Sequence, residues 1–154
     1  MTKPAKPTAR LSQISGIKEV AVGQRYGPYV HELTETITST WTKALNDKNP
    51  SYVDDEAARK AGNSRRVAPP GTMTLHFLKA AMDAWGGMPV GMILARQEVD
   101  FHAPAYPGDK LATEFVIQTK TIKKERPWFD LEMTTRNTKG ETVAVSRITW
   151  IMAR

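Results

Sequence analysis

Residues 72–85 read TMTLHFLKAAMDAW, and a helix drawn through them would be apolar around nearly its whole circumference. A helix that is hydrophobic on most of its faces is buried in a core. Gly71 opens the segment, and Gly86 and Gly87 end it. The sequence therefore predicts one buried central helix, whose apolar residues are Met73, Leu75, His76, Phe77, Leu78, Ala80, Ala81, Met82 and Trp85.

The rest of the chain reads mainly as strands. A strand places successive side chains on opposite faces, so an apolar residue at every second position predicts a strand with one buried face. One predicted strand has Leu111, Thr113, Phe115 and Ile117 on one face, and in the next Phe129, Leu131, Met133 and Thr135 alternate with Trp128, Asp130, Glu132 and Thr134. The predicted strands cover 92–102, 110–122, 128–136 and 141–152, after a turn-rich and then extended segment at 23–33. A curved antiparallel sheet wrapped around one long central helix buries both apolar surfaces, which predicts an α+β hot-dog fold.

Length and composition bound the class of protein. The chain has 154 residues, 40% of them hydrophobic and 25% charged, which suits one globular domain. We expect a flexible basic segment over 1–19 and a single domain over 20–154. Cysteine is absent, and three scattered histidines form no ligand cluster, so no metal or other cofactor is expected. No apolar run reaches the roughly 18–20 residues of a membrane span, so we expect a cytoplasmic protein with no membrane partner.

The formal net charge of +6 has two interpretations. It is either an ordinary basic surface or a means of attracting a polyanion. A nucleic-acid partner is not expected, because no dense run of Lys and Arg with interleaved aromatic residues occurs. A phosphorylated small molecule such as coenzyme A suits a diffuse positive charge equally well.

A dense polar segment, ALNDKNPSYVDDEAARKAG, precedes the central helix at residues 44–62. A helix predicted over 34–46 ends here, because the residue before Pro50 avoids helical backbone angles. Asp54 or Asp55 can cap the short helix that follows. The loop between the two helices gathers three polar side chains around the proline, namely Asp47, Asn49 and Tyr52.

Four segments together resemble the MaoC-like dehydratase family, which includes the (R)-specific enoyl-CoA hydratases. They are LNDKNPSYVDDEAARKAG at 45–62, VAPPGTM at 67–73, VDFHAPAYPGDKL at 99–111 and NTKGETV at 137–143. The resemblance covers Val20 to Arg154. It implies a hot-dog fold, a homodimer or a heterodimer with another hot-dog subunit, and acyl thioesters of coenzyme A or an acyl carrier as ligands, in fatty-acid or sterol metabolism.

The family's catalytic loop reads Asp-x-Asn-Pro-x-His. Here Asp47, Asn49 and Pro50 match it, whereas Tyr52 stands at the position of the histidine. In the family, the Asp and the His activate a water that adds to an enoyl thioester. An imidazole exchanges protons near neutral pH because its pKa is about 6.5, whereas a phenol, at about 10, is a poor base. The resemblance implies catalytic roles for the loop residues Asp47, Asn49 and Tyr52. His76, the only histidine of the predicted central helix, is a candidate replacement base, although a core histidine is its plainer interpretation.

Binding roles also follow from the resemblance. Gly71 and Thr72 begin the central helix, whose free amide groups would form an oxyanion hole for the thioester carbonyl. The phosphates of coenzyme A would be held by Arg65, Arg66, Lys123 and Lys124. Each assignment has a plainer alternative, a turn for Gly71 and solvated surface for the cations. His31 and His102 are given no functional role.

Three functions remain open from the sequence. The first is the hydration of enoyl thioesters, or the reverse dehydration of 3-hydroxyacyl thioesters. The second is a non-catalytic acyl-binding subunit that pairs with a catalytic MaoC-like partner, because Tyr52 resembles the halves of this family that have lost the catalytic pair. The third is a hot-dog thioesterase, whose acidic residue would be Asp83, near the helix end where the helix dipole disfavours a carboxylate.

Overall fold

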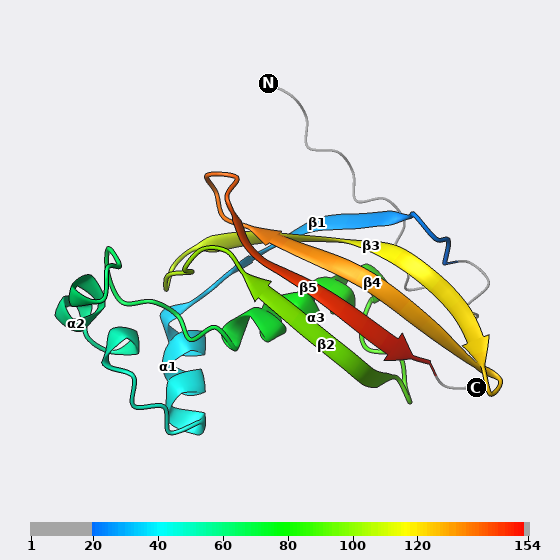
Figure 1. The fold of residues 1–154 in the computed structure, drawn as a ribbon, viewed down its shortest axis with the longest axis horizontal. Coiled ribbons are helices and arrows are strands. Elements are labelled where there is room, and N and C mark those ends of the chain that lie inside the picture. The colour runs from blue at the N-terminus through cyan, green and yellow to red at the C-terminus, as the bar shows by residue number, and fades with distance from the viewer. Residues whose placement is uncertain (1–19, 153–154) are drawn as a thin grey trace.

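In the computed structural model, which describes residues 20–152, one long helix lies against one face of a curved five-stranded sheet (Figure 1). The sheet is antiparallel, with strand order β1-β3-β4-β5-β2. The strands are β1 (Arg25–Glu32), β2 (Ile93–Phe101), β3 (Lys110–Lys123), β4 (Arg126–Arg136) and β5 (Thr142–Ile151). The helices are α1 (Glu35–Ala44), the short 3-10 helix η3 (Pro50–Tyr52), α2 (Asp55–Lys60) and α3 (Thr72–Trp85). The predicted α+β architecture, a sheet around one long helix, is confirmed.

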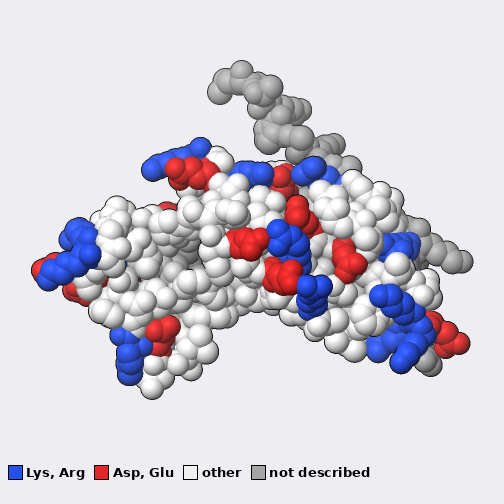
Figure 2. All heavy atoms as spheres, viewed as in Figure 1, with Lys and Arg blue, Asp and Glu red and all other residues white. Residues whose placement is uncertain are grey.

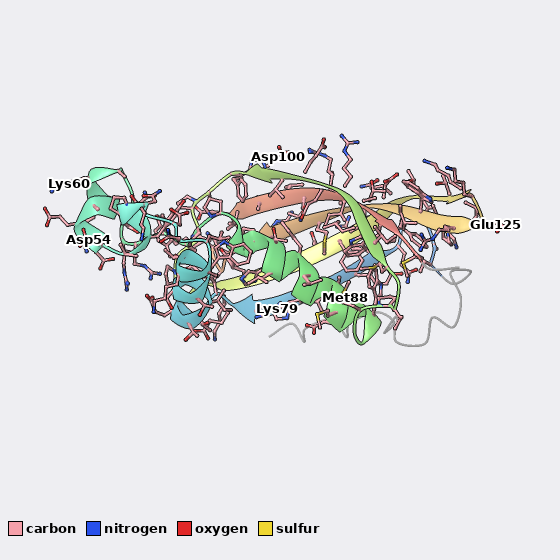
Figure 3. The ribbon with its side chains drawn as sticks, turned by 90° about the horizontal axis from the view of Figure 1, so that it is seen from below. Asp54, Lys60, Lys79, Met88, Asp100 and Glu125 are labelled. Atoms are coloured by element: carbon pink, nitrogen blue, oxygen red, sulfur yellow. The ribbon has the colours of Figure 1, made fainter. Side chains whose placement is uncertain are left out.

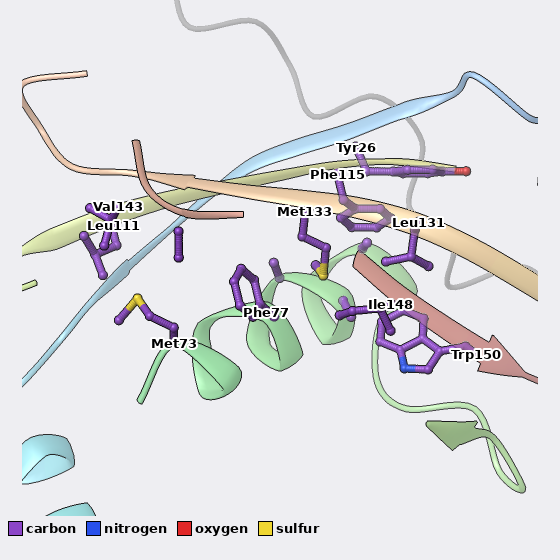
Figure 4. Close-up of a cluster of buried hydrophobic side chains, with 14 of the residues drawn as sticks. Tyr26, Met73, Phe77, Leu111, Phe115, Leu131, Met133, Val143, Ile148 and Trp150 are labelled. Carbon is purple, nitrogen blue, oxygen red and sulfur yellow. The ribbon is translucent and has the colours of Figure 1, made fainter. Parts of the chain in front are cut away.

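The core lies between α3 and the face of the sheet that it covers (Figure 4). The four residues assigned to one face in each of β3 and β4, Leu111, Thr113, Phe115 and Ile117, then Phe129, Leu131, Met133 and Thr135, are all buried. Two of them, Thr113 and Thr135, are polar, and their hydroxyl groups form a cross-strand hydrogen bond of 2.8 Å. Met73 and Phe77 reach the same core from α3. Burial of each large apolar side chain contributes about 1.5–3 kcal/mol to stability, so this layer holds the helix on the sheet.

α3 begins and ends where the sequence predicts, at Thr72 and Trp85. It ends because Gly86 adopts the left-handed conformation, with φ of +69°. The prediction that the helix is buried on most faces is wrong, since the exposed fractions of Leu78 and Met82 are 37% and 41%. The sheet covers only one side of the helix, so an apolar stripe on the other side is open in the single chain.

The two edge strands of the sheet differ in how they are protected. β1 has a bulge between Tyr26 and Tyr29, around a cis Gly27–Pro28 peptide bond. Proline and bulges hinder the pairing of an exposed edge with another strand. β2 also has an irregularity in its pairing, between Leu94 and Arg96, but it contains no proline, and all nine of its residues are exposed or half-buried, including the apolar Ile93, Leu94 and Phe101. β2 is therefore the open edge of the sheet.

The short helices lie together at the end of the molecule where α3 begins (Figure 1). Thr34 caps α1 by accepting a hydrogen bond from the N–H of Ile37, and Asp54 caps α2 by accepting one from Ala57 at 2.6 Å. Among residues 20–152, no helix combines the length and the hydrophobicity that a membrane crossing requires.

The β3–β4 hairpin lies at the opposite end, where Glu125 is labelled in Figure 3. Its turn is tighter than the predicted 123–127, because Lys124 and Glu125 both adopt positive φ, of 50° and 60°. Such angles suit a two-residue turn whose twist matches the flanking strands, so both strands extend further than predicted.

Charged side chains of both signs are interspersed over the face of the sheet seen in Figure 2. Arg147 lies 2.8 Å from Asp100 and 3.7 Å from Glu132, and Arg136 lies 2.7 Å from Glu114. The middle of this face is therefore a mixed surface of exposed ion pairs, which have little effect on stability.

Candidate functional site

A pocket of about 450 Å³ opens at the end of the molecule where α3 begins. Three segments that are distant in sequence form it: the loop at 49–52, the connection from α2 to α3, and the segment that follows β2. Its volume lies within the range of about 300–1,000 Å³ that is usual for small-molecule sites. The lining residues are Asn49, Ser51, Tyr52, Ala61, Asn63, Val67, Ala68, Pro69, Pro70, Met73, Phe101, His102, Ala103, Pro104, Ala105 and Val143.

The loop at 47–52 is held by two successive Asx turns. Asp47 Oδ1 accepts a hydrogen bond from the N–H of Asn49, and Asn49 Oδ1 accepts one from Ser51, both at 3.0 Å. Asn49 and Tyr52 line the pocket, as the motif leads one to expect of a functional loop, but Asp47 is not among the lining residues. The carboxylate of Asp47 thus shapes the loop, and the loop presents the phenol of Tyr52 to the pocket.

The first turn of α3 offers fewer free amide groups than the sequence suggests. The N–H of Thr72 donates to the carbonyl of Pro69 at 2.9 Å, and the Thr72 hydroxyl donates to the same oxygen at 2.7 Å. The amide of Gly71 has no acceptor among residues 20–152. A Cβ at Gly71 would lie 2.8 Å from the ring of Trp41, so this glycine is required for close packing against α1. Neither residue lines the pocket, and only the Gly71 amide is free to bind a ligand oxygen.

His76 lies in the core and does not line the pocket. Its side chain is fully buried, and neither ring nitrogen has a hydrogen-bond partner among the described residues. Burial lowers the pKa of His76 to about 4, with the positive charge of Lys79 and then His31 acting in the same direction. The ring is therefore neutral near pH 7, and the structure places it with His31 of β1, away from the loop whose missing base it was expected to replace.

Asp83, the candidate acid of the thioesterase hypothesis, also lies away from the pocket. Its carboxylate is 3.0 Å from Nε2 of His31. This contact joins α3 to β1. Asp83 therefore has a structural partner and no access to the pocket.

The four cations expected to hold phosphates fall into two groups. Arg65 contacts the carbonyl of Pro107 at 2.6 Å and Asp109 at 3.3 Å, and Arg66 contacts Glu35 and Asp55 at 3.0 and 3.3 Å. These arginines have protein partners, and neither of them lines the pocket. Lys123 and Lys124 belong instead to the β3–β4 hairpin at the opposite end of the sheet (Figure 3), where Lys123 lies 4.7 Å from the centre of the Trp128 ring. The structure does not bring these two lysines to the pocket.

The sequence did not point to three polar residues that line the pocket, Ser51, Asn63 and His102. Among its described lining residues, His102 and Tyr52 are the ones with a titratable side chain. The side chains of Tyr52, Asn63 and His102 have no hydrogen-bond partner among residues 20–152. The sequence signal for His102 was its position at the end of the predicted strand 92–102, shortly before Pro104. The pocket thus combines apolar walls with unused polar groups but contains no carboxylate, which suits binding better than acid–base catalysis by an Asp–His pair.

The sequence of the chain is similar to those of known proteins. The family described as "FAS1-like, dehydratase domain region" matches residues 20–146. A protein of Thermomonospora curvata named "Probable enoyl-CoA hydratase alpha subunit" is 28% identical over 137 residues, which is 74% of this chain and 42% of that protein. The chain thus spans less than half the length of this relative.

Solved structures share the fold. The MaoC-like dehydratase of Rhodospirillum rubrum superposes with a TM-score of 0.76 at 24% identity, over 90% of this chain and 96% of that one. A chain of the C-terminally truncated HadBC complex of Mycobacterium tuberculosis, a 3R-hydroxyacyl-ACP dehydratase, also superposes with a TM-score of 0.76, at 22% identity over 84% of this chain and 96% of that one. These likenesses identify the sheet and helix arrangement as the hot-dog fold.

Proposed function

The chain belongs to the MaoC-like dehydratase family of hot-dog proteins, and from this premise we propose that it is the acyl-thioester-binding subunit of a two-chain hydratase or dehydratase. The observation that carries the proposal is Tyr52. It occupies the histidine position of the family's catalytic loop and lines a pocket that contains no carboxylate. In this proposal, the partner chain supplies the Asp–His pair that activates water.

The walls of the pocket suit an acyl thioester. Met73, Val143 and Phe101 offer apolar surface to a carbon chain. The amide of Gly71 and the side chain of Asn49 offer donors near the pocket, and a thioester carbonyl is the acceptor that such donors would hold. Shape and polarity therefore support binding by this chain, whether or not the bond-making step occurs here.

The open edge of the sheet supports a partner of the same fold. β2 exposes Ile93, Leu94 and Phe101, and it has none of the proline that blunts β1. An antiparallel strand from a second hot-dog sheet would satisfy the free backbone groups of β2 and bury these side chains. The names of two similar proteins favour a two-chain assembly, since one is called an alpha subunit and the other is a complex.

The experiment compares the full chain alone with the full chain bound to the hot-dog protein that co-purifies with it. Each preparation is given crotonyl-CoA, and loss of the enoyl absorbance is recorded. We expect the chain alone to bind crotonyl-CoA without turnover, and the complex to hydrate it. Hydration by the chain alone at the rate of the complex would refute the proposal, and so would a failure of both preparations to bind crotonyl-CoA.

A second candidate is a hydratase that works without a catalytic partner. Asp47, Asn49 and Pro50 match the family loop, and the titratable Tyr52 and His102 line one pocket. In that case the chain alone would hydrate crotonyl-CoA, and Asp47→Asn would abolish the reaction. Release of free coenzyme A without hydration would indicate a thioesterase instead.

A further inference from the structure

We propose that His102 is a specificity-determining residue of the pocket, which binds an oxygen on the acyl chain and so favours 3-hydroxyacyl over saturated acyl thioesters. The inference rests on the proposed acyl-binding function. It adds to that function a residue that lies outside the catalytic loop motif and lines the same pocket.

Backbone hydrogen bonds to two other segments fix the chain around His102. The N–H groups of His102 and Ala103 both donate to the carbonyl of Val143 in β5, at 2.9 and 3.3 Å. The carbonyl of Ala105 accepts a hydrogen bond of 2.8 Å from Ala68, on the wall that leads to α3. The segment after β2 is therefore held by hydrogen bonds to Val143 and to Ala68. A side chain on a backbone fixed in this way can orient a ligand.

The imidazole of His102 has no structural role that would use its polar atoms. The residue is exposed, and neither ring nitrogen has a partner among residues 20–152. Tyr52 from the loop and Asn63 from the connection between α2 and α3 line the same pocket with unused side-chain groups. Three segments thus bring free donors and acceptors to one place, which is the arrangement that fixes an oxygen-bearing ligand.

The chemistry of the ligand follows from these groups. The acyl group of a saturated acyl thioester carries one polar atom, the carbonyl oxygen. A 3-hydroxyacyl thioester adds a hydroxyl group, which both donates and accepts hydrogen bonds and can therefore pair with a ring nitrogen of an imidazole. An added hydrogen bond to this hydroxyl strengthens the binding of the oxygenated chain and leaves that of the saturated chain unchanged, so the polar groups select for the oxygenated chain.

Calorimetric titration with two ligands of equal chain length tests this. The full chain and its complex are titrated with 3-hydroxybutyryl-CoA and with butyryl-CoA. We expect the hydroxylated ligand to bind about three- to tenfold more tightly, the difference that one neutral hydrogen bond makes. His102→Leu should remove that preference while changing the Kd for butyryl-CoA by less than about twofold, and His102→Gln, which keeps a donor and an acceptor, should retain most of it.

Gln118→Leu is the matched control, because Gln118 is exposed and lines a separate depression with Asp130 and Arg147. This variant should keep the full preference. An unchanged ratio in His102→Leu, or equal weakening of both ligands, would refute the role of His102 while leaving acyl binding intact. Absence of binding by both ligands to the wild-type chain and complex would overturn the proposed function as well.

Discussion

His76 of α3 and His31 of β1 face each other edge to face, with ring centroids 6.3 Å apart and an angle of 62° between the ring planes. Asp83 holds His31 through a contact of 3.0 Å to Nε2, whereas His76 has no polar partner among the described residues. Burial keeps the pKa of His76 at about 4, with Lys79 and His31 adding to the shift. The contact between α3 and β1 therefore contains an imidazole that must stay uncharged.

Acidification should destabilise the fold through His76. A histidine in an unfolded chain titrates at about pH 6.5, so between about pH 6.5 and pH 4 the unfolded state binds a proton that the folded state excludes. The stability of the fold is thus greatest above this window and falls as the pH decreases through it, by up to about 3 kcal/mol from this residue. Chemical denaturation of the wild type and of His76→Phe at about pH 7.5 and about pH 4.5 measures this.

The His76→Phe variant keeps an aromatic ring in the core but has nothing to protonate there. Its free energy of unfolding should therefore change less between the two pH values than that of the wild type. Equal losses in both proteins would assign the acid sensitivity to other groups and contradict the role of His76.

Gly71→Ala should destabilise the chain by about 1–3 kcal/mol, the usual cost of overpacking. The backbone at Gly71, with φ of −58°, accepts alanine, but the added Cβ would lie 2.8 Å from the ring of Trp41. The cost therefore comes from the indole, and adding Trp41→Leu should remove most of it. Urea denaturation of the two single variants and the double variant gives the coupling energy. Additive effects would contradict this account.

Tyr26→Phe should leave stability unchanged or raise it by up to about 1 kcal/mol. The Tyr26 side chain is fully buried and stacks on Phe115 at 4.8 Å between centroids, yet its hydroxyl has no partner among residues 20–152. Burial, followed by the influence of Tyr29, raises the pKa of Tyr26 to about 12. Removing this hydroxyl keeps the packing and removes an unsatisfied group. Chemical denaturation measures the difference.

The matched control is Thr113→Val, in which the lost hydroxyl has a partner. Thr113 and Thr135 share a hydrogen bond of 2.8 Å, so the variant leaves Thr135 unsatisfied and should lose about 1–3 kcal/mol. A similar loss in Tyr26→Phe would mean that its hydroxyl also has a partner, such as a buried water.

The helices and strands were predicted well from local sequence patterns, because neighbouring residues determine where each one forms and ends. The alternation in β3 and β4 and the glycine after α3 depend on neighbouring residues, and the structure confirms them. The exposed side of α3 could not be predicted, because Leu78 and Met82 differ from buried residues only in what the sheet fails to cover. The sequence of the helix does not show which of its apolar faces the sheet covers.

The pocket was predicted only in part, for the same reason. The loop motif identifies Asn49 and Tyr52, which do line the pocket. His102 arrives there because β2 ends beside β5, and that pairing joins residues far apart in sequence. The hydrogen bond from the amide of Thr72 to the carbonyl of Pro69 could not be predicted either, because it depends on how the chain turns at Pro69. Positions that depend on packing between distant segments cannot be predicted from local sequence patterns.

Leu94→Lys should prevent association through the open edge of the sheet. Leu94 lies on β2 with an exposed fraction of 51%, and a lysine on an edge strand opposes pairing with another strand. Because Leu94 is already exposed, the stability of the chain should change by no more than about 0.5 kcal/mol. Co-purification of the hot-dog partner, followed by light scattering on the eluted protein, measures the association.

Val30→Lys is the matched control on the other edge. Val30 lies on β1 with an exposed fraction of 60%, but Pro28, which has no counterpart in β2, already hinders pairing there. The same charge placed on β1 should therefore leave both partner binding and hydration of crotonyl-CoA by the complex intact. If Val30→Lys disrupts the complex and Leu94→Lys does not, the partner binds at β1, and the assignment of β2 as the interface is wrong.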